Sequence, residues 1–167
     1  DGVPTIVGDV DMSLVEVWTP IGTENRPFNI KFNGGGFEIK HLNASAPIFG
    51  YCNDAEISNV IIDESCNFVQ KGDFGATINL APLALEIAGA SVVSQCKSEA
   101  NITVDGSSTT ANYISHLGGL VVSVEEGAKV SECEFRGNIT TVASNKINIT
   151  AADNSYSYVG GLVSKNA

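Results

Sequence analysis

Gly118-Gly119-Leu120-Val121 is the stretch that decides the fold, because the chain contains related versions of it. Three other stretches have two small or ring-closed residues before an aliphatic one: Ala46-Pro47-Ile48-Phe49, Ala81-Pro82-Leu83-Ala84 and Gly160-Gly161-Leu162-Val163. The aliphatic anchors of the four copies are spaced by 35, 37 and 42 positions, and they are Ile48, Leu83, Leu120 and Leu162. Repeats of this length are typical of solenoids, in which each unit buries its apolar face against its neighbours.

Two further apolar segments follow the anchors at similar offsets. The second segment covers residues 55–60, 90–96 and 128–133, and the third begins at Asn67, Asn101 and Asn138. The segments are short, alternate apolar with polar residues and favour Val, Ile and Thr, which indicates strands. Only Leu80 to Ala90 is rich enough in Ala and Leu to allow a short helix. The sequence therefore predicts an all-β, right-handed parallel β-helix with coils of about 35–42 residues and about three strands per coil.

The repeat also predicts the domain organisation. We expect a single domain over residues 1–167, because no linker interrupts the chain. Its expected parts are an N-terminal coil at 1–45, repeat coils at 46–80, 81–117 and 118–159, and an incomplete final coil at 160–167. An unfinished coil exposes strand edges, so we expect a segment of a longer protein or an end completed by another subunit.

Composition excludes some partners. The 167 residues include 19 acidic and 9 basic side chains, which gives a net charge of −10. Such a surface repels nucleic acid, so no polynucleotide partner is expected. No apolar run is long enough to span a bilayer, so no membrane span is expected in this sequence.

The repeats resemble those of a known family. The Gly-Gly-Leu-Val elements are similar to the GLUG-motif repeats of secreted and cell-surface β-helix proteins. The N-terminal third resembles the first coil of such proteins through Asp9-Val10-Asp11-Met12, Trp18-Thr19-Pro20-Ile21-Gly22 and Phe28 to Leu42. Four positions in the last stretch depart from the family pattern: Ile30, Asn33, Gly35 and Phe37.

The resemblance implies a function class but no shared active site. It implies a secreted or cell-surface, non-enzymatic structural or adhesion module that binds a glycan or a protein through its lateral faces. Two alternatives stay open, a carbohydrate-active enzyme fragment and a filament subunit that associates end to end. No catalytic, cofactor-binding or metal-ligating residue is assigned.

Histidines and charged residues have structural interpretations. His116 aligns with Tyr158 of the next repeat, which favours a structural ring, and His41 is expected to be a solvated strand residue. Asp9 and Asp11 could together bind calcium, although one face of a strand explains the pair equally well. Lys97 and Glu134 align in successive coils and predict a cross-coil ion pair.

The four cysteines lack metal-binding spacing. Cys96 and Cys133 occupy equivalent positions of adjacent coils, and we expect them to form a ladder of free thiols. Their stacking would bring the backbones within disulfide range, but their side chains would project side by side. If the chain contains a disulfide, Cys52–Cys66 is the favoured pair.

Asparagine recurs in two patterns that compete. The N-glycosylation pattern occurs at Asn43, Asn101, Asn138 and Asn148. Asn67, Asn101 and Asn138 also recur in register, which predicts amides that hydrogen-bond along a ladder. An inward ladder at Asn101 and Asn138 would exclude glycans there, and a corner or ladder role is favoured for them, whereas Asn43 and Asn148 stay open for glycosylation.

Overall fold

Parallel strands make up the regular structure of this protein. The computed structural model describes residues 2–71, 77–106, 114–142 and 156–167. These ranges contain β1 to β20 and no helix. The expectation of an all-β chain is therefore confirmed over these residues, and the stretch considered for a short helix instead contributes to β9 (Ile78–Leu80) and β10 (Ala84–Ala88).

The strands form five sheets, and every strand pairing between them is parallel. The first sheet holds β5 (Phe49–Asn53), β10, β15 (Val121–Val124) and β20 (Val163–Asn166). The second holds β2 (Lys31–Asn33), β6 (Glu56–Ser58), β11 (Val92–Ser94) and β16 (Lys129–Ser131). The third holds β1 (Val10–Asp11), β3 (Glu38–Lys40), β7 (Ile61–Ile62), β12 (Lys97–Ser98) and β17 (Glu134–Phe135). The fourth holds β4 (Asn43–Ala44), β8 (Asn67–Lys71), β13 (Asn101–Asp105) and β18 (Ile139–Val142), and the fifth holds β9, β14 (Ile114–Gly118) and β19 (Tyr156–Gly160).

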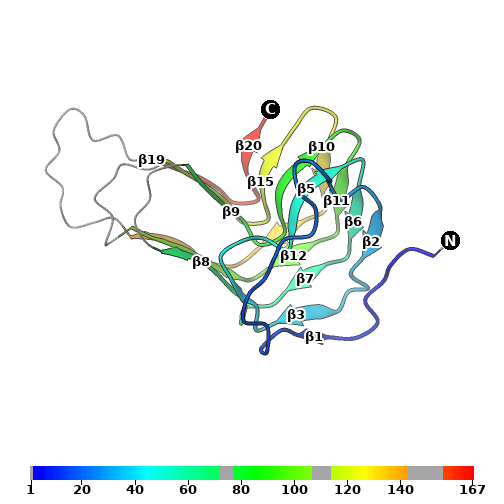
Figure 1. The fold of residues 1–167 in the computed structure, drawn as a ribbon, viewed down its shortest axis with the longest axis horizontal. Coiled ribbons are helices and arrows are strands. Elements are labelled where there is room, and N and C mark those ends of the chain that lie inside the picture. Colours follow the sequence, from blue (N-terminus) through cyan, green and yellow to red (C-terminus); the bar gives the residue numbers. More distant parts are fainter. Residues whose placement is uncertain (1, 72–76, 107–113, 143–155) are drawn as a thin grey trace, which may run out of the picture.

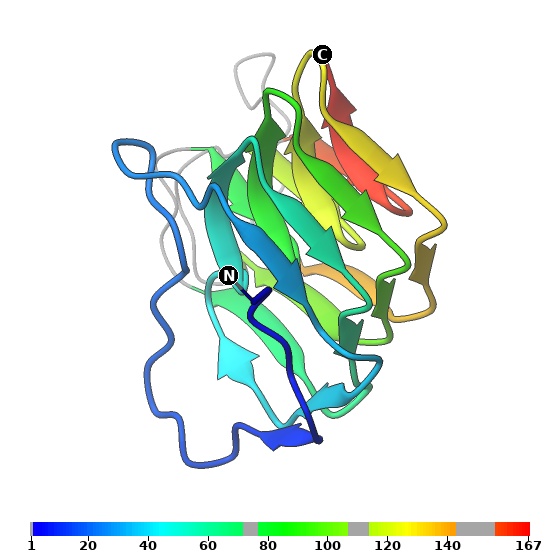
Figure 2. The ribbon, with the colours of Figure 1, turned by 90° about the vertical axis from the view of Figure 1, so that its right-hand side faces the viewer.

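The strand register confirms the repeat spacing. In the first sheet Phe49 pairs with Ala84, Ala84 with Val121, and Val121 with Val163. These steps of 35, 37 and 42 positions match those between the anchors. The anchors themselves are joined by backbone bonds, since the amide of Leu83 donates to the Leu120 carbonyl and that of Leu120 to the Leu162 carbonyl, both at 3.0 Å. Successive windings therefore lie on one another, as Figure 2 shows.

The expected number of strands per winding is wrong. The chain passes through all five sheets between β5 and β10, rather than through about three strands. The extra bends lie at Asn59, Gln95 and Glu132, which have positive φ angles of 52°, 53° and 53°. Each left-handed residue turns the chain from the second sheet into the third, within a segment that reads as one strand in the sequence.

The unequal repeat lengths have a structural origin. Asp105 pairs with Lys71, 34 positions earlier, but Leu117 pairs with Leu80, 37 positions earlier. In the next winding the step grows from 37 positions at Val142 to 42 at Tyr156. Residues are therefore added between the fourth and fifth sheets in both windings. Through the first four sheets the step stays at 37 positions in the later winding and varies from 34 to 36 positions in the earlier one.

Close backbone approach explains a glycine of the repeated motif. A Cβ on Gly119 would collide with the Gly161 carbonyl oxygen and with Cγ of Phe135. This copy of the motif therefore needs glycine at position 119, where its winding meets the next.

A single apolar column fills the space between the sheets. Its largest fully buried side chains come from all five sheets and the turns between them, and they include Phe49, Ile57, Ile62, Phe68, Leu83, Ile102, Leu117 and Leu120. Leu83 and Leu120 are fully buried, and Leu162 packs partly buried against the same cluster. The expected apolar ladder through the three leucines is therefore present. Each winding stabilises the next by burying this surface.

The first residues cross one end of the stack. We call residues 2–22 the N-terminal strap; it carries β1 and runs beside β2 and β3 in Figure 1. It is joined to the first winding through the parallel bridges Thr5–Asn33 and Ile21–Phe49. Within the described ranges, the chain forms no helix with the length and apolar character that crossing a membrane requires.

Candidate functional site

A ladder of four asparagine amides runs along the start of the fourth sheet. The Nδ2 of Asn138 donates to Oδ1 of Asn101 at 2.9 Å, and the Nδ2 of Asn101 donates to Oδ1 of Asn67 at 3.5 Å. The Nδ2 of Asn67 in turn donates to Oδ1 of Asn43 at 3.2 Å. The predicted ladder therefore forms, with a fourth member at Asn43. Its amides are half-buried or exposed on the outer surface, in contrast to the inward ladder that the sequence predicts, because the alternate residues Phe68 and Ile102 occupy the interior.

The two inner amides use their second hydrogen as well. The Nδ2 of Asn67 also donates to the Ser65 carbonyl at 3.0 Å, and that of Asn101 to the Glu64 carbonyl at 3.3 Å. An amide nitrogen carries two hydrogens, whereas its oxygen can accept two bonds. The inner rungs therefore present spare acceptors but no spare donors to a partner.

Two shallow grooves flank this asparagine ladder. One, of about 600 Å³, is lined by Asn43, Ala44, Ser45, Asn67, Val69, Gln70 and Lys71. The other, of about 430 Å³, is lined by Asp63, Glu64, Ser65, Glu99, Asn101, Arg136 and Asn138. Both grooves lie on the lateral surface of the stack and include ladder amides. We call this surface, with its two grooves, the ladder face.

Two of the three carboxylates that line the second groove, Asp63 and Glu99, are engaged by protein groups. Asp63 accepts bonds from the hydroxyl and the backbone amide of Ser65, and these hold the pKa of Asp63 below its usual range. Glu99 pairs with Lys97 at 2.7 Å. Cleavage of a glycosidic bond needs an acid whose pKa is raised, so the shift at Asp63 has the wrong sign for a general acid.

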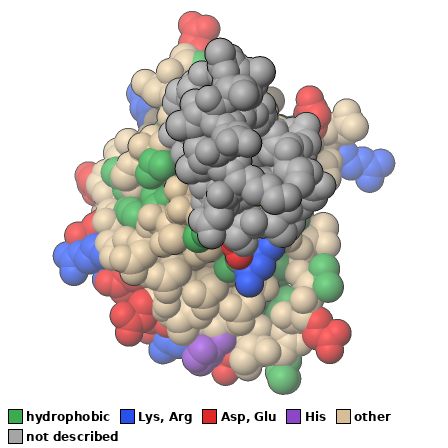
Figure 3. All heavy atoms as spheres, turned by 90° about the vertical axis from the view of Figure 1, so that its left-hand side faces the viewer, with side chains coloured by type: hydrophobic (Ala, Val, Ile, Leu, Met, Phe, Trp, Pro, Cys, Tyr) green, Lys and Arg blue, Asp and Glu red, His purple; other side chains and the backbone are tan. Residues whose placement is uncertain are grey.

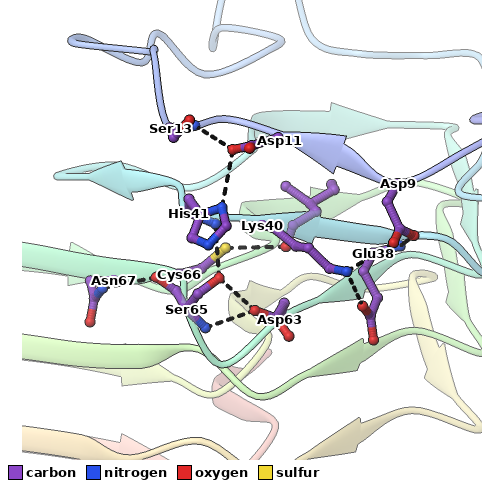
Figure 4. A network of polar contacts seen from close by, with 11 residues as sticks. Asp9, Asp11, Ser13, Glu38, Lys40, His41, Asp63, Ser65, Cys66 and Asn67 are labelled. Carbon is purple, nitrogen blue, oxygen red and sulfur yellow. Dashed lines mark hydrogen bonds and ion pairs between the residues drawn. The ribbon is translucent and has the colours of Figure 1, made fainter.

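A polar network ties the N-terminal strap to this region (Figure 4). Lys40 forms ion pairs with Asp9 and Glu38, both at 2.8 Å. His41 Nδ1 lies 3.0 Å from Asp11 Oδ1, which also accepts the amide of Ser13. Contacts to Lys40 and Ser13 lower the pKa values of Asp9 and Asp11, respectively. The two aspartates thus have separate partners, and the described part of the chain has no group of three or more His, Cys, Asp or Glu side chains arranged for a metal.

The two histidines have different surroundings. His41 follows β3 in a left-handed conformation with φ of 58°, and its amide donates to Ser65 Oγ at 2.9 Å. It is therefore an exposed corner residue, not the expected strand residue. His116 pairs in register with Tyr158, as the alignment predicts, and desolvation lowers its pKa.

Lys97 and Glu134 lie opposite each other in β12 and β17, but their ion pairs run along the strands. Lys97 pairs with Glu99, and Glu134 pairs with Arg136 at 2.6 Å. The expected cross-coil ion pair is therefore absent, because each charge finds a partner two residues further on the same strand face.

All four cysteines have free thiols. The favoured Cys52–Cys66 bridge is not present, because Cys52 belongs to the first sheet and Cys66 precedes the fourth, where its thiol donates to the Ile39 carbonyl at 3.2 Å. Cys96 and Cys133 do form the expected ladder of thiols, preceding the paired residues Lys97 and Glu134. Donation from Cys96 lowers the pKa of Cys133, the more exposed thiol.

The asparagines that match the N-glycosylation pattern are not equivalent. Both amide hydrogens of Asn101 are used, and Asn138 donates to its neighbour, whereas Nδ2 of Asn43 donates to no other described residue. Asn148 lies outside the described residues. The sequon pattern alone does not distinguish these asparagines. That Asn43 stacks on Asn67, 24 residues further along the chain, is clear only from the pairing of β4 with β8.

On the face seen in Figure 3, acidic, basic and hydrophobic side chains are scattered among the backbone and the other side chains of the described residues. Comparison with known protein families, curated proteins and solved structures finds no match.

Proposed function

We propose that this protein is a non-enzymatic structural or adhesion module of a secreted or cell-surface protein, related to the GLUG-repeat proteins. In this proposal the chain winds as a right-handed parallel β-helix, and the ladder face binds a glycan. The observation that carries the proposal is the row of four amides, flanked by grooves, on a rigid lateral wall.

Binding is favoured over catalysis by the state of the carboxylates. The groove beside Asn101 contains three carboxylates, and two of them, Asp63 and Glu99, serve hydrogen bonds or ion pairs within the protein. A retaining or inverting glycosidase needs one carboxyl to donate a proton and another to act as nucleophile or base. Amides and carboxylates on a rigid wall instead suit hydrogen bonding to sugar hydroxyl groups.

A glycan array with the intact chain tests this proposal. The double substitution Arg136→Ala with Asn138→Ala alters the groove at two exposed residues, and Lys129→Ala with Ser131→Ala alters exposed residues of the second sheet as a matched control. We expect the first variant to lose glycan binding and the second to retain it. Equal binding by both variants would move the site elsewhere, and absence of glycan binding by the unaltered chain would contradict the proposed ligand.

A protein partner is the second candidate ligand. The acceptor-rich rungs could receive backbone or side-chain N–H groups as well as hydroxyls. A screen against extracellular matrix proteins with the same two variants distinguishes this case, because the groove variant would then lose the protein and not the glycan.

A further inference from the structure

An apolar chamber of about 240 Å³ lies between the N-terminal strap and the first windings. Its wall consists of apolar atoms, and the residues that matter here are Ile6, Met12 and Trp18 of the strap and Phe32, Leu42 and Phe49 of the windings. None of these residues belongs to the ladder face.

Hydrogen bonds hold the strap at a fixed distance from the windings. The amide of Ile6 donates to the Asn33 carbonyl, and the amide of Met12 to the Lys40 carbonyl, both at 2.9 Å. Nε1 of Trp18 donates to the Pro47 carbonyl, also at 2.9 Å. The strap is therefore attached to the windings at Ile6, Met12 and Trp18. These bonds oppose collapse of the strap onto the apolar column.

The chemistry of the wall selects the occupant. Water needs two to four polar partners in a cavity, and an apolar chamber of about 150 Å³ stays dry and accepts benzene. A charged ligand would lose its hydration without compensation. The only indole N–H on the wall is already bound to Pro47, so the chamber offers no donor from that ring.

Aromatic groups make the site more selective. The rings of Phe32 and Phe49 meet edge to face with centroids 5.5 Å apart. The Trp18 ring and the Met12 sulfur lie on the same wall. Edge-to-face contacts and sulfur contacts both favour an aromatic guest over a saturated one.

We propose that this chamber binds an uncharged aromatic molecule of one or two fused rings. The site is separate from the ladder face and independent of the proposed glycan binding.

The strap wall of the chamber contains two reporters. Trp18 is the only tryptophan and Met12 the only methionine, so intrinsic fluorescence and the methionine methyl resonance each report on one wall residue. Toluene is the probe, and benzoate is its charged control. We expect toluene to shift both signals saturably and to raise the midpoint of thermal unfolding, because a ligand of the folded state stabilises it. Benzoate should do neither.

Two neighbouring substitutions test the location. Ile6→Phe places a ring inside the chamber, and Val7→Phe places the same ring on the outer side of the strap, where Val7 is 87% exposed. We expect the first variant to lose the toluene effects and the second to keep them. If Ile6→Phe does not fold, the Met12 methyl shift in the unaltered protein decides. Absence of a saturable toluene effect, equal responses to toluene and benzoate, or equal binding by two folded variants would overturn the proposal.

Discussion

Truncation of the stacked leucines tests whether the windings stabilise one another as a column. Leu83 is fully buried between windings, with Ile48 on one side and Leu120 on the other. Leu83→Ala removes side-chain carbons worth about 0.8 kcal/mol each and leaves a cavity that both neighbours maintain. We expect the free energy of unfolding to fall by about 3–4 kcal/mol.

Leu162→Ala is the matched control for this experiment. The same atoms are removed, but Leu162 is only partly buried and lies in the last described winding. A partly exposed site loses less transfer free energy and leaves little enclosed cavity, so the expected cost is about 1 kcal/mol.

Urea unfolding followed by circular dichroism measures both costs. The midpoints should shift while the slope stays constant, since neither substitution changes the area exposed on unfolding. Equal losses for the two variants, or a loss below about 1 kcal/mol for Leu83→Ala, would refute the idea that inner windings depend on burial from both sides.

Three other predictions concern single contacts. Gly119→Ala should lower the free energy of unfolding by about 1–3 kcal/mol in chemical denaturation, because its Cβ would meet a carbonyl of the next winding, whereas Gly161→Ala should be nearly neutral, since no atom lies within 4 Å of the added Cβ. Burial, and then the charge of a neighbouring carboxylate, raise the pKa of Glu86 above its ordinary value of 4.5, so the protonated form is favoured on folding and stability is lost as the pH rises from about 4.5 through the raised pKa. Glu86→Gln should therefore increase the unfolding free energy at about pH 7 and leave it unchanged at about pH 3. A gain at both pH values would contradict this cause. Cys133 should be the first thiol alkylated by iodoacetamide, as peptide mass spectrometry would show, and Cys96→Val should slow that reaction at about pH 7 because it removes the thiol that lowers the pKa of Cys133.

The sequence predicted the stacking correctly because the strongest signal, an aliphatic residue after two small ones, marks the same place in each winding. Leu83 and Leu120 are bound to their neighbours at the expected spacing. The number of walls was not predictable in the same way. Gln95 and Glu132 take left-handed conformations that are not expected from their residue types. The sequence therefore indicates one strand where the structure has two short strands.

Side-chain partners were harder to predict than backbone register. Lys97 and Glu134 are opposite each other as expected, yet each is nearer to a charge on its own strand. Long charged side chains choose among several partners of similar energy, so alignment alone does not fix the choice. The chamber under the strap was also missed, because it depends on how Trp18 and Ile6 approach windings that lie far along the chain.

The direction of the asparagine ladder restricts what the ladder face can bind. Three of the four amide nitrogens donate toward the N-terminal end of the stack, from Asn138 to Asn101, then to Asn67 and Asn43. The inner rungs have both hydrogens engaged, so a ligand there meets oxygen acceptors, and the nearby carboxylates of Asp63 and Glu99 add more. Hydroxyl groups can donate to such a surface, whereas a ligand that offers only acceptors, such as a sulfate ester, would meet repulsion. Neutral glycans should therefore bind better than their sulfated forms, and a preference for the sulfated forms would show that this ladder is not the contact surface.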